Sequence, residues 1–136
     1  MTNRSWTMAM SFAIALLAGT WGAHSLRADT PTFKRVELQH HDLSAPDREV
    51  VTARAEFQPG GMAPRHSHPG EEIGYVLEGE FVLEVDGQPA KKMKPGDSFF
   101  IPAGTVHAAK NPGKGGAAVL STYIVEKGKP FATPAK

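Results

Sequence analysis

From Arg35 onward the chain alternates short β-branched or apolar runs with turn residues, and no segment keeps a long helical period. Seven of these runs predict strands, over residues 35–41, 49–58, 74–78, 81–85, 98–101, 106–110 and 117–125. The turns between them contain Pro or Gly, as in Pro59-Gly60-Gly61 and Pro95-Gly96. The chain has 14 Gly and 11 Pro, a content typical of turn-rich proteins. The pattern therefore predicts an all-β protein.

The clearest local signal is Asp86-Gly87, which separates the runs 81–85 and 89–93. A two-residue type I′ turn needs positive φ at both central positions, which Asp-Gly tolerates, so this pair predicts a tight hairpin. Seven or more antiparallel strands in roughly 100 residues must each bury one face. The sequence therefore predicts a sandwich or a jelly-roll barrel.

Chain length and cysteine content limit the number of domains and the kinds of cross-link that the chain can have. A chain of 136 residues suits one compact domain. There is no cysteine, so disulfides and thiolate metal ligands are excluded. The last ten residues, 127–136, contain two Pro and three Lys, and we expect them to form a loosely attached tail.

The first residues have the layout of a secretory signal peptide. Arg4 precedes an apolar stretch over residues 8–18, and small residues follow up to Ala28. The alternative is a membrane anchor, but the stretch has 11 residues, whereas a membrane-spanning helix needs about 20. We expect residues 1–28 to be removed and residues 29–136 to form the mature domain, with its core over about 34–126. The protein would then be periplasmic or secreted, without stable membrane insertion.

Charge and export signal indicate the kind of partner. Without residues 1–28 the chain has 13 Lys and Arg against 14 Asp and Glu, a formal charge of −1. A nearly neutral surface argues against nucleic acid as a partner and leaves small molecules as the expected ligands. The segment around Arg4 lacks a twin-arginine pair, which indicates export in the unfolded state and metal uptake outside the cytoplasm.

The most informative segment runs from Gly60 to Gly79. His66 and His68 are two residues apart, so on a strand their side chains point to the same face. Two imidazoles on one face can share a metal ion. After the turn at Pro69, Glu72 follows on the expected neighbouring strand, where its carboxylate can complete the same face.

A second segment, residues 96–111, supplies a third histidine, His107, after a Pro-Ala-Gly turn. Three imidazole nitrogens and one carboxylate oxygen suit one divalent Mn, Fe, Co, Ni, Cu or Zn ion and leave positions open for water or substrate. Such a site is typical of metal chemistry more than of a purely structural ion.

Together the two segments resemble the motifs of the cupin superfamily, G-x5-H-x-H-x3-E-x6-G and G-x5-P-x-G-x2-H-x3-N. The resemblance implies a single-domain jelly-roll β-barrel of the small bacterial, RmlC-like form, with the ion inside near one mouth and with possible homodimerisation. The matching metal-ligand positions are His66, His68, Glu72 and His107, and the matching Gly, Pro and Asn positions are Gly60, Gly79, Gly96, Pro102, Gly104 and Asn111.

Two ambiguities concern neighbouring residues. Glu71 and Glu72 are adjacent, so only one can face inward, and the family spacing selects Glu72. His40 and His41 lie outside both motifs and face opposite ways, so we expect neither to be a ligand.

Three classes of function fit these residues. The first is an enzyme whose metal activates dioxygen or polarises an enol or carbonyl of a small oxygen-bearing substrate, a dioxygenase-like reaction by analogy with the family. The second is a module that binds a sugar or organic acid without turnover, and the third is a barrel that the metal merely stabilises. A general acid or base inside the barrel would favour the enzyme, and the candidates near the motifs are Arg65, Tyr75, Glu78 and Glu84. Alternation from Glu72 places Tyr75 outward.

Overall fold

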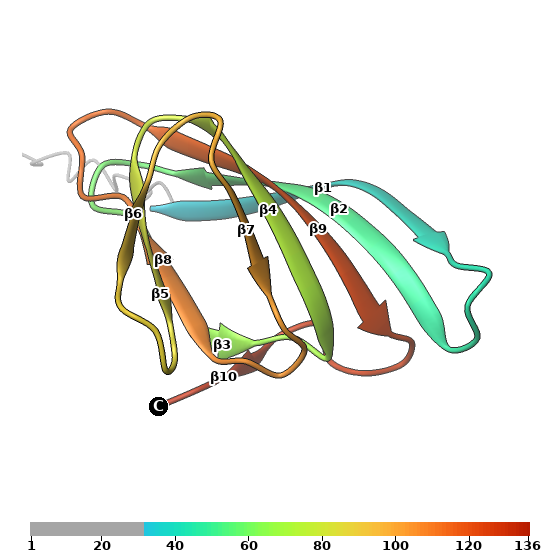
Figure 1. Cartoon of the computed structure of the whole chain (residues 1–136). Helices are drawn as coiled ribbons and strands as arrows, with labels where there is room; N and C mark the ends of the chain where they lie inside the picture. The colour runs from blue at the N-terminus through green and yellow to red at the C-terminus, as the bar shows by residue number, and fades with distance from the viewer. Residues whose placement is uncertain (1–31) are drawn as a thin grey trace, which may run out of the picture.

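The computed structural model describes residues 32–136, and these residues form strands and turns with no helix (Figure 1). The predicted signal peptide lies outside the described residues. The ten strands are β1 (Phe33–Asp42), β2 (Arg48–Phe57), β3 (Met62–Ser67), β4 (Gly70–Glu78), β5 (Phe81–Val85), β6 (Lys91–Met93), β7 (Ser98–Ile101), β8 (His107–Lys110), β9 (Ala117–Glu126) and β10 (Thr133–Pro134). The all-β prediction is confirmed.

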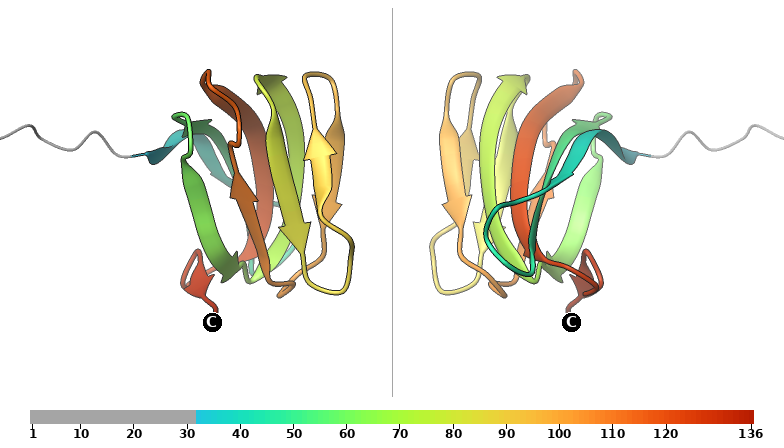
Figure 2. Two further views of the ribbon diagram at one scale, coloured as in Figure 1. Left: turned by 90° about the vertical axis from the view of Figure 1, so that its left-hand side faces the viewer. Right: turned by 90° about the vertical axis from the view of Figure 1, so that its right-hand side faces the viewer.

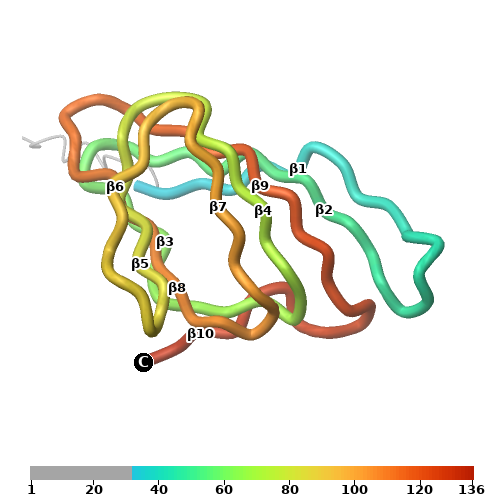
Figure 3. The backbone as a smooth tube through the Cα atoms, in the orientation of Figure 1, coloured from blue at the N-terminus to red at the C-terminus, as the bar shows by residue number. Residues whose placement is uncertain are grey.

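The strands form two five-stranded sheets that face each other (Figure 2). One sheet has the order β1-β2-β9-β4-β7 and the other the order β10-β3-β8-β5-β6, and every pairing is antiparallel. The backbone crosses repeatedly from one sheet to the other, as the tube in Figure 3 shows. This is the predicted jelly-roll arrangement.

The core lies between the sheets because inward and outward side chains alternate along each strand. In β9 the side chains of Val119, Ser121, Tyr123 and Val125 are buried, whereas those between them are partly exposed. The main apolar cluster comes from both sheets: Ala55, Phe57, Ala63, Val76, Phe81, Leu83, Val85, Met93, Ile101, Ala117 and Val119.

The motif glycines adopt the backbone conformations that the turns need, and Asn111 forms hydrogen bonds that stabilise the neighbouring loops. Gly60, Gly79, Gly96 and Gly104 all have positive φ. At Gly79, φ is +68° and a side chain would overlap the carbonyl oxygen of Gly116, so only glycine fits there without strain. Asn111 is buried, and its amide nitrogen donates to three backbone carbonyls, with the shortest bond, 2.7 Å, to Gly115. These motif residues are therefore structural.

The sequence missed strand β3 and the first residues of β4. Pro64 within β3 and Pro69-Gly70 after it read as turns, since proline cannot donate a ladder hydrogen bond. In the structure the β3–β8 pairing shifts register between Ala63 and His66, and this irregularity accommodates the proline. Strand β4 then begins at Gly70 and pairs with β9 from its first residue.

The prediction of a loosely attached tail over 127–136 is wrong. Strand β10 pairs with β3, with Pro134 opposite His66, and the amide of Ala135 donates to the carbonyl of Arg65 at 3.0 Å. The ring of Phe131 packs edge-on against Tyr123, with the centroids 4.8 Å apart. The composition of this segment suggested a loose tail. In the structure, the Phe131 ring and the pairing of β10 with the edge of β3 hold it against the domain.

Candidate metal centre

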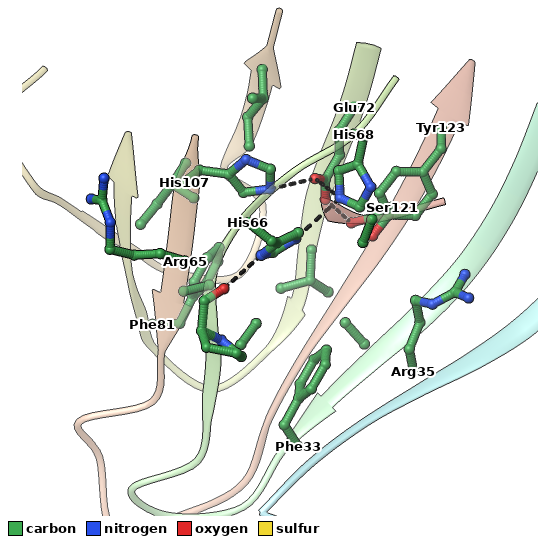
Figure 4. A pocket seen from close by; sticks show the side chains of 18 of the residues that line it. Phe33, Arg35, Arg65, His66, His68, Glu72, Phe81, His107, Ser121 and Tyr123 are labelled. Atoms are coloured by element: carbon green, nitrogen blue, oxygen red, sulfur yellow. Dashed lines mark hydrogen bonds and ion pairs between the residues drawn. The ribbon is translucent and has the colours of Figure 1, made fainter. Parts of the chain in front are cut away.

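The three motif histidines meet between the sheets. His66 and His107 are directly opposite each other on β3 and β8, and their ring centroids lie 4.3 Å apart. His68 follows β3, and its ring centroid is 5.4 Å from that of His107. One ring nitrogen from each histidine lies within 4.8 Å of the other two, a spacing that can hold one metal ion (Figure 4).

Backbone carbonyls orient all three rings in the same way. The Nδ1 atoms of His66, His68 and His107 lie 2.6, 2.6 and 2.9 Å from the carbonyl oxygens of Pro64, Phe131 and Thr105. A carbonyl oxygen can only accept, so each Nδ1 carries the proton. In the neutral ring, Nε2 then has a free lone pair, as in metal-binding histidines whose other nitrogen donates a hydrogen bond.

The inner nitrogens are placed where a cation fits. The Nε2 atoms of His66 and His68 lie 3.1 Å apart, and with both Nδ1 atoms protonated they present lone pairs to each other. The Nε2 atom of His107 is buried and has no hydrogen bond of good geometry among the described residues. A metal ion bound by all three nitrogens would remove this repulsion and satisfy the buried atom, so the residues fit a metal.

Glu72 completes the group from the facing sheet. Its Oε2 atom lies 3.1 Å from Nε2 of His107 and 3.6 Å from Nε2 of His68. The hydroxyl of Ser121 donates to Oε1 at 2.8 Å. Burial on its own would raise the pKa of the Glu72 carboxyl, but His107 and Ser121 outweigh burial and lower it. Glu72 is therefore a buried carboxylate at neutral pH, whereas Glu71 is on the other face of β4.

The histidines differ in their basicity. Burial lowers the pKa of His66 and of His68, so both are neutral at pH 7. Burial acts in the same direction on His107, but the Glu72 carboxylate and the Thr105 carbonyl outweigh it and raise the pKa of His107. A proton therefore competes with a metal first at His107.

A cavity of about 560 Å³ opens beside the histidines, within the usual size range of small-ligand sites. Phenylalanine and aliphatic side chains form most of its wall, and Tyr123 borders it next to Glu72. Burial, followed by the charge of Glu72, raises the pKa of the Tyr123 phenol. Tyr123 thus stays protonated and can donate a hydrogen bond into the cavity.

Most of the acid–base candidates from the sequence lie outside this cavity. Tyr75 points outward as predicted and is 49% exposed. Glu78 pairs with Arg54 and Glu84 pairs with Lys110, each at 2.6 Å on the exterior. Outside the motifs, the His40 ring is 3.0 Å from a carboxylate oxygen of Glu49 on the neighbouring strand and 44% exposed, which agrees with its expected non-ligand role. Of the four candidates, Arg65 alone borders the cavity.

Sequence reasoning missed Arg35, Ser121, Tyr123 and Phe131, which all border the cavity. For two of them the signal was present. Ser121 and Tyr123 occupy inward positions of a strand whose other inward residues are apolar, and a hydroxyl at a core position indicates a site. Phe131 could not be placed without knowing that the residues just after it form strand β10 and pair with β3.

The structure is a jelly roll of two sheets, with three imidazoles and one carboxylate close together in its interior. This arrangement is typical of β-barrel proteins that can bind a metal inside the barrel. The family model described as "Cupin domain" matches residues 53–133, so the chain belongs to the cupin family.

Curated relatives match the central part of the chain. Germin-like protein subfamily 2 member 2 of Arabidopsis thaliana is 43% identical over 79 residues, which are 54% of this chain and 36% of the relative. Dimethylsulfoniopropionate lyase DddQ of Ruegeria pomeroyi is 38% identical over 63 residues, which are 46% of this chain and 31% of the relative. The chain thus spans about a third of the length of these relatives.

Solved structures share the fold over most of the described residues. An oxalate oxidase in complex with the substrate analogue glycolate superposes with a TM-score of 0.62 at 26% identity, covering 78% of this chain and 56% of that chain. An RmlC-like cupin from Shewanella frigidimarina gives a TM-score of 0.57 at 27% identity, covering 74% and 82%. The similarity to an RmlC-like cupin agrees with the family form that the motifs predicted.

Proposed function

We propose that this protein is a metal-dependent cupin enzyme that acts on a small oxygen-bearing molecule, with the metal on His66, His68, Glu72 and His107. The observation that carries the proposal is the convergence of three Nε2 atoms whose Nδ1 atoms are all held by backbone carbonyls. When bound, a divalent Mn, Fe, Co, Ni, Cu or Zn ion supplies a Lewis acid, or a redox centre for dioxygen. The similarity to oxalate oxidase and germin-like proteins supports the oxidoreductase class.

The surrounding residues have distinct roles in this proposal. The Glu72 carboxylate would offset the positive charge of a bound metal, and the Ser121 hydroxyl, which donates to it at 2.8 Å, holds it in place. The protonated Tyr123 hydroxyl can orient a substrate oxygen next to Glu72. Apolar side chains line the rest of the cavity, and a ligand that fills it would displace water and so strengthen electrostatic interactions inside it.

The second candidate is a binding module for a small organic ligand. It is favoured by the lining itself: among the described residues that border the cavity, the hydroxyl groups are those of Ser121 and Tyr123, and Glu72 is the one carboxylate. An enzyme with this lining would depend on its metal for turnover, whereas a binding protein needs no further acid or base.

One experiment separates these candidates. Protein purified from its native compartment would be analysed for transition metals, then tested for dioxygen consumption and product formation with oxalate, enediols, flavonols and β-diketones. An enzyme contains about one metal per chain and turns over at least one of these compounds, or a related one, in a metal-dependent manner. Binding without turnover across a wider panel would support the binding module. A native protein without transition metal would contradict the metal-dependent enzyme and would leave binding through the cavity lining as the function.

The C-terminal segment is expected to contribute to metal affinity, because the Phe131 carbonyl accepts the Nδ1 proton of His68. Removing such an outer hydrogen-bond partner typically lowers metal affinity about 10- to 100-fold. Deleting residues 128–136 should therefore weaken metal binding by this factor in a calorimetric titration. Phe131→Ala retains the carbonyl but loses the ring that docks the segment, so its effect should be smaller. Unchanged affinity in the deletion variant would contradict this role.

We also propose that the protein is exported and acts in the periplasm or outside the cell. The support is the signal-like sequence before residue 29. The mature chain should begin between Leu26 and Asp29, which N-terminal sequencing of the osmotic-shock fraction would measure. A chain that retains Met1 and sediments with membranes would contradict cleavage.

A further inference from the structure

The cavity has an aromatic wall that the histidine site does not use. Phe33, Phe57, Phe81 and Phe99 form a continuous row, with successive ring centroids 5.0, 6.3 and 5.9 Å apart, and all four border the cavity. Rings arranged in this way favour an apolar, and above all an aromatic, ligand body. A ligand in contact with them gains affinity from the apolar surface it buries.

Arg35 lies at the border of the same cavity, on strand β1. Its guanidinium carbon is 3.9 Å from the centre of the Phe131 ring. The Phe131 ring centroid is in turn 4.9 Å from that of His68, so one aromatic ring separates Arg35 from the histidine cluster. Figure 4 shows Arg35 on the side of the cavity that also holds Phe33 and Tyr123.

The two arginines that border the cavity differ in their partners. Arg65 makes two hydrogen bonds to the Asp86 carboxylate, at 2.8 and 2.9 Å, and its Nε donates to the carbonyl of Lys136. Arg35 has no acidic partner and no side-chain hydrogen bond among residues 32–136, and no lysine of this part of the chain borders the cavity. Its planar donors are held on an aromatic face and remain available to a ligand.

We propose that the cavity binds an aromatic or similarly apolar carboxylate, with its carboxylate on Arg35 and its body along the phenylalanine row. A ligand oxygen at the far end would then face the histidine cluster, and this last contact alone rests on the proposed function. A two-carbon acid such as glycolate has no apolar body and would leave the aromatic wall uncovered. On this proposal the ligand is larger and more apolar than the glycolate bound by the structurally similar oxalate oxidase.

The test compares acids with uncharged analogues of the same shape. Para-hydroxybenzoate, para-hydroxyphenylacetate and para-hydroxyphenylpropionate span a range of lengths, and each would be titrated beside its carboxamide and beside glycolate. Titrations would use metal-loaded and metal-free protein. A charge-assisted bidentate contact should make at least one acid bind about tenfold or more tightly than its amide in both forms. Glycolate should bind more weakly than that acid.

Substitutions identify the residue responsible. Arg35→Gln should abolish the acid–amide preference, Arg35→Lys should keep part of it, and the matched control Arg65→Gln should retain it. Metal content should be the same in all of these proteins. An acid preference that is absent, or that survives Arg35→Gln, would overturn the inference, as would glycolate binding tightest of all. A wild-type protein that takes up no metal but keeps the Arg35-dependent preference would contradict only the proposed metal function.

Discussion

Replacing His107 by Ala, or His66 by Ala, is expected to abolish stoichiometric metal binding. Each substitution removes one of the three proposed imidazole ligands, whose inner nitrogens lie within 4.8 Å of one another, and it leaves a gap that water would fill. With two imidazoles and one carboxylate left, the affinity should fall by several orders of magnitude. Elemental analysis after dialysis, together with a competitive titration, would measure this loss.

Glutamate variants provide a matched pair for the same measurement. Glu72→Gln removes the buried charge that lies 3.1 Å from the inner nitrogen of His107, so metal affinity should fall. Glu71→Gln changes the neighbouring side chain on the opposite face of β4 and should leave the affinity unchanged. The reverse order would show that Glu71 is the ligand.

His40→Ala controls for the loss of any histidine, because His40 lies on β1 and pairs with Glu49 away from the cavity. It should bind metal like the wild type. One tightly bound ion per chain in the His66 or His107 variant would contradict the assignment of that residue as a ligand.

The sequence predicted that His66, His68 and Glu72 would lie close together, because they are separated by a few residues along one strand or across one short turn. His107 is on the distant strand β8, and the resemblance to the cupin motifs, not local spacing, placed it with them. His66 and His68 share a face by strand periodicity, and Glu72 follows the turn at Pro69 at a spacing that the family motif also has. The left-handed φ of Gly79 explains why glycine recurs in that motif. The spacing of His66, His68 and Glu72 and the glycine turn are local properties, and local properties can be read from sequence.

The outer part of the cavity could not be predicted because it depends on contacts between distant segments. Arg35 approaches Phe131 across 96 residues of sequence, and Phe131 reaches His68 only because β10 pairs with the free edge of β3. No sequence motif signals either the contact between Arg35 and Phe131 or the pairing of β10 with β3. Strand β3 itself was not predicted because a proline such as Pro64 is more typical of a turn than of a strand interior.

Metal affinity is also expected to fall steeply as the pH decreases from about 7.5 to about 5. Histidine binds metal only as the neutral imidazole, so protons and metal compete for the same nitrogens. The raised pKa of His107 means that this competition begins there, above the ordinary histidine value of about 6.5. His66 and His68, whose pKa values burial lowers, join the competition at lower pH.

The metal-free protein responds to pH in two opposing ways. The raised pKa of His107 contributes stability that is complete below the unfolded pKa of about 6.5 and disappears as the pH rises through the folded value. The lowered pKa values of His66 and His68 contribute stability above about pH 6.5 that is lost as the pH falls through their folded values. The pKa of Glu72 is lowered, so this carboxylate stays charged throughout and releases no proton.

The measurement is the melting temperature of metal-loaded and metal-free protein across this pH range. Binding to the folded state adds RT ln(1 + [L]/Kd) to the free energy of unfolding, so the gap between the two melting curves reports metal affinity. The slope of log affinity against pH should reach at most about one where His107 alone takes up a proton, and it should steepen, to at most about three, as His66 and His68 also become protonated. The two melting temperatures should converge at the acidic end. A metal-dependent stabilisation that stays constant over the whole range would exclude a three-histidine site, since carboxylate and backbone oxygens release no protons there.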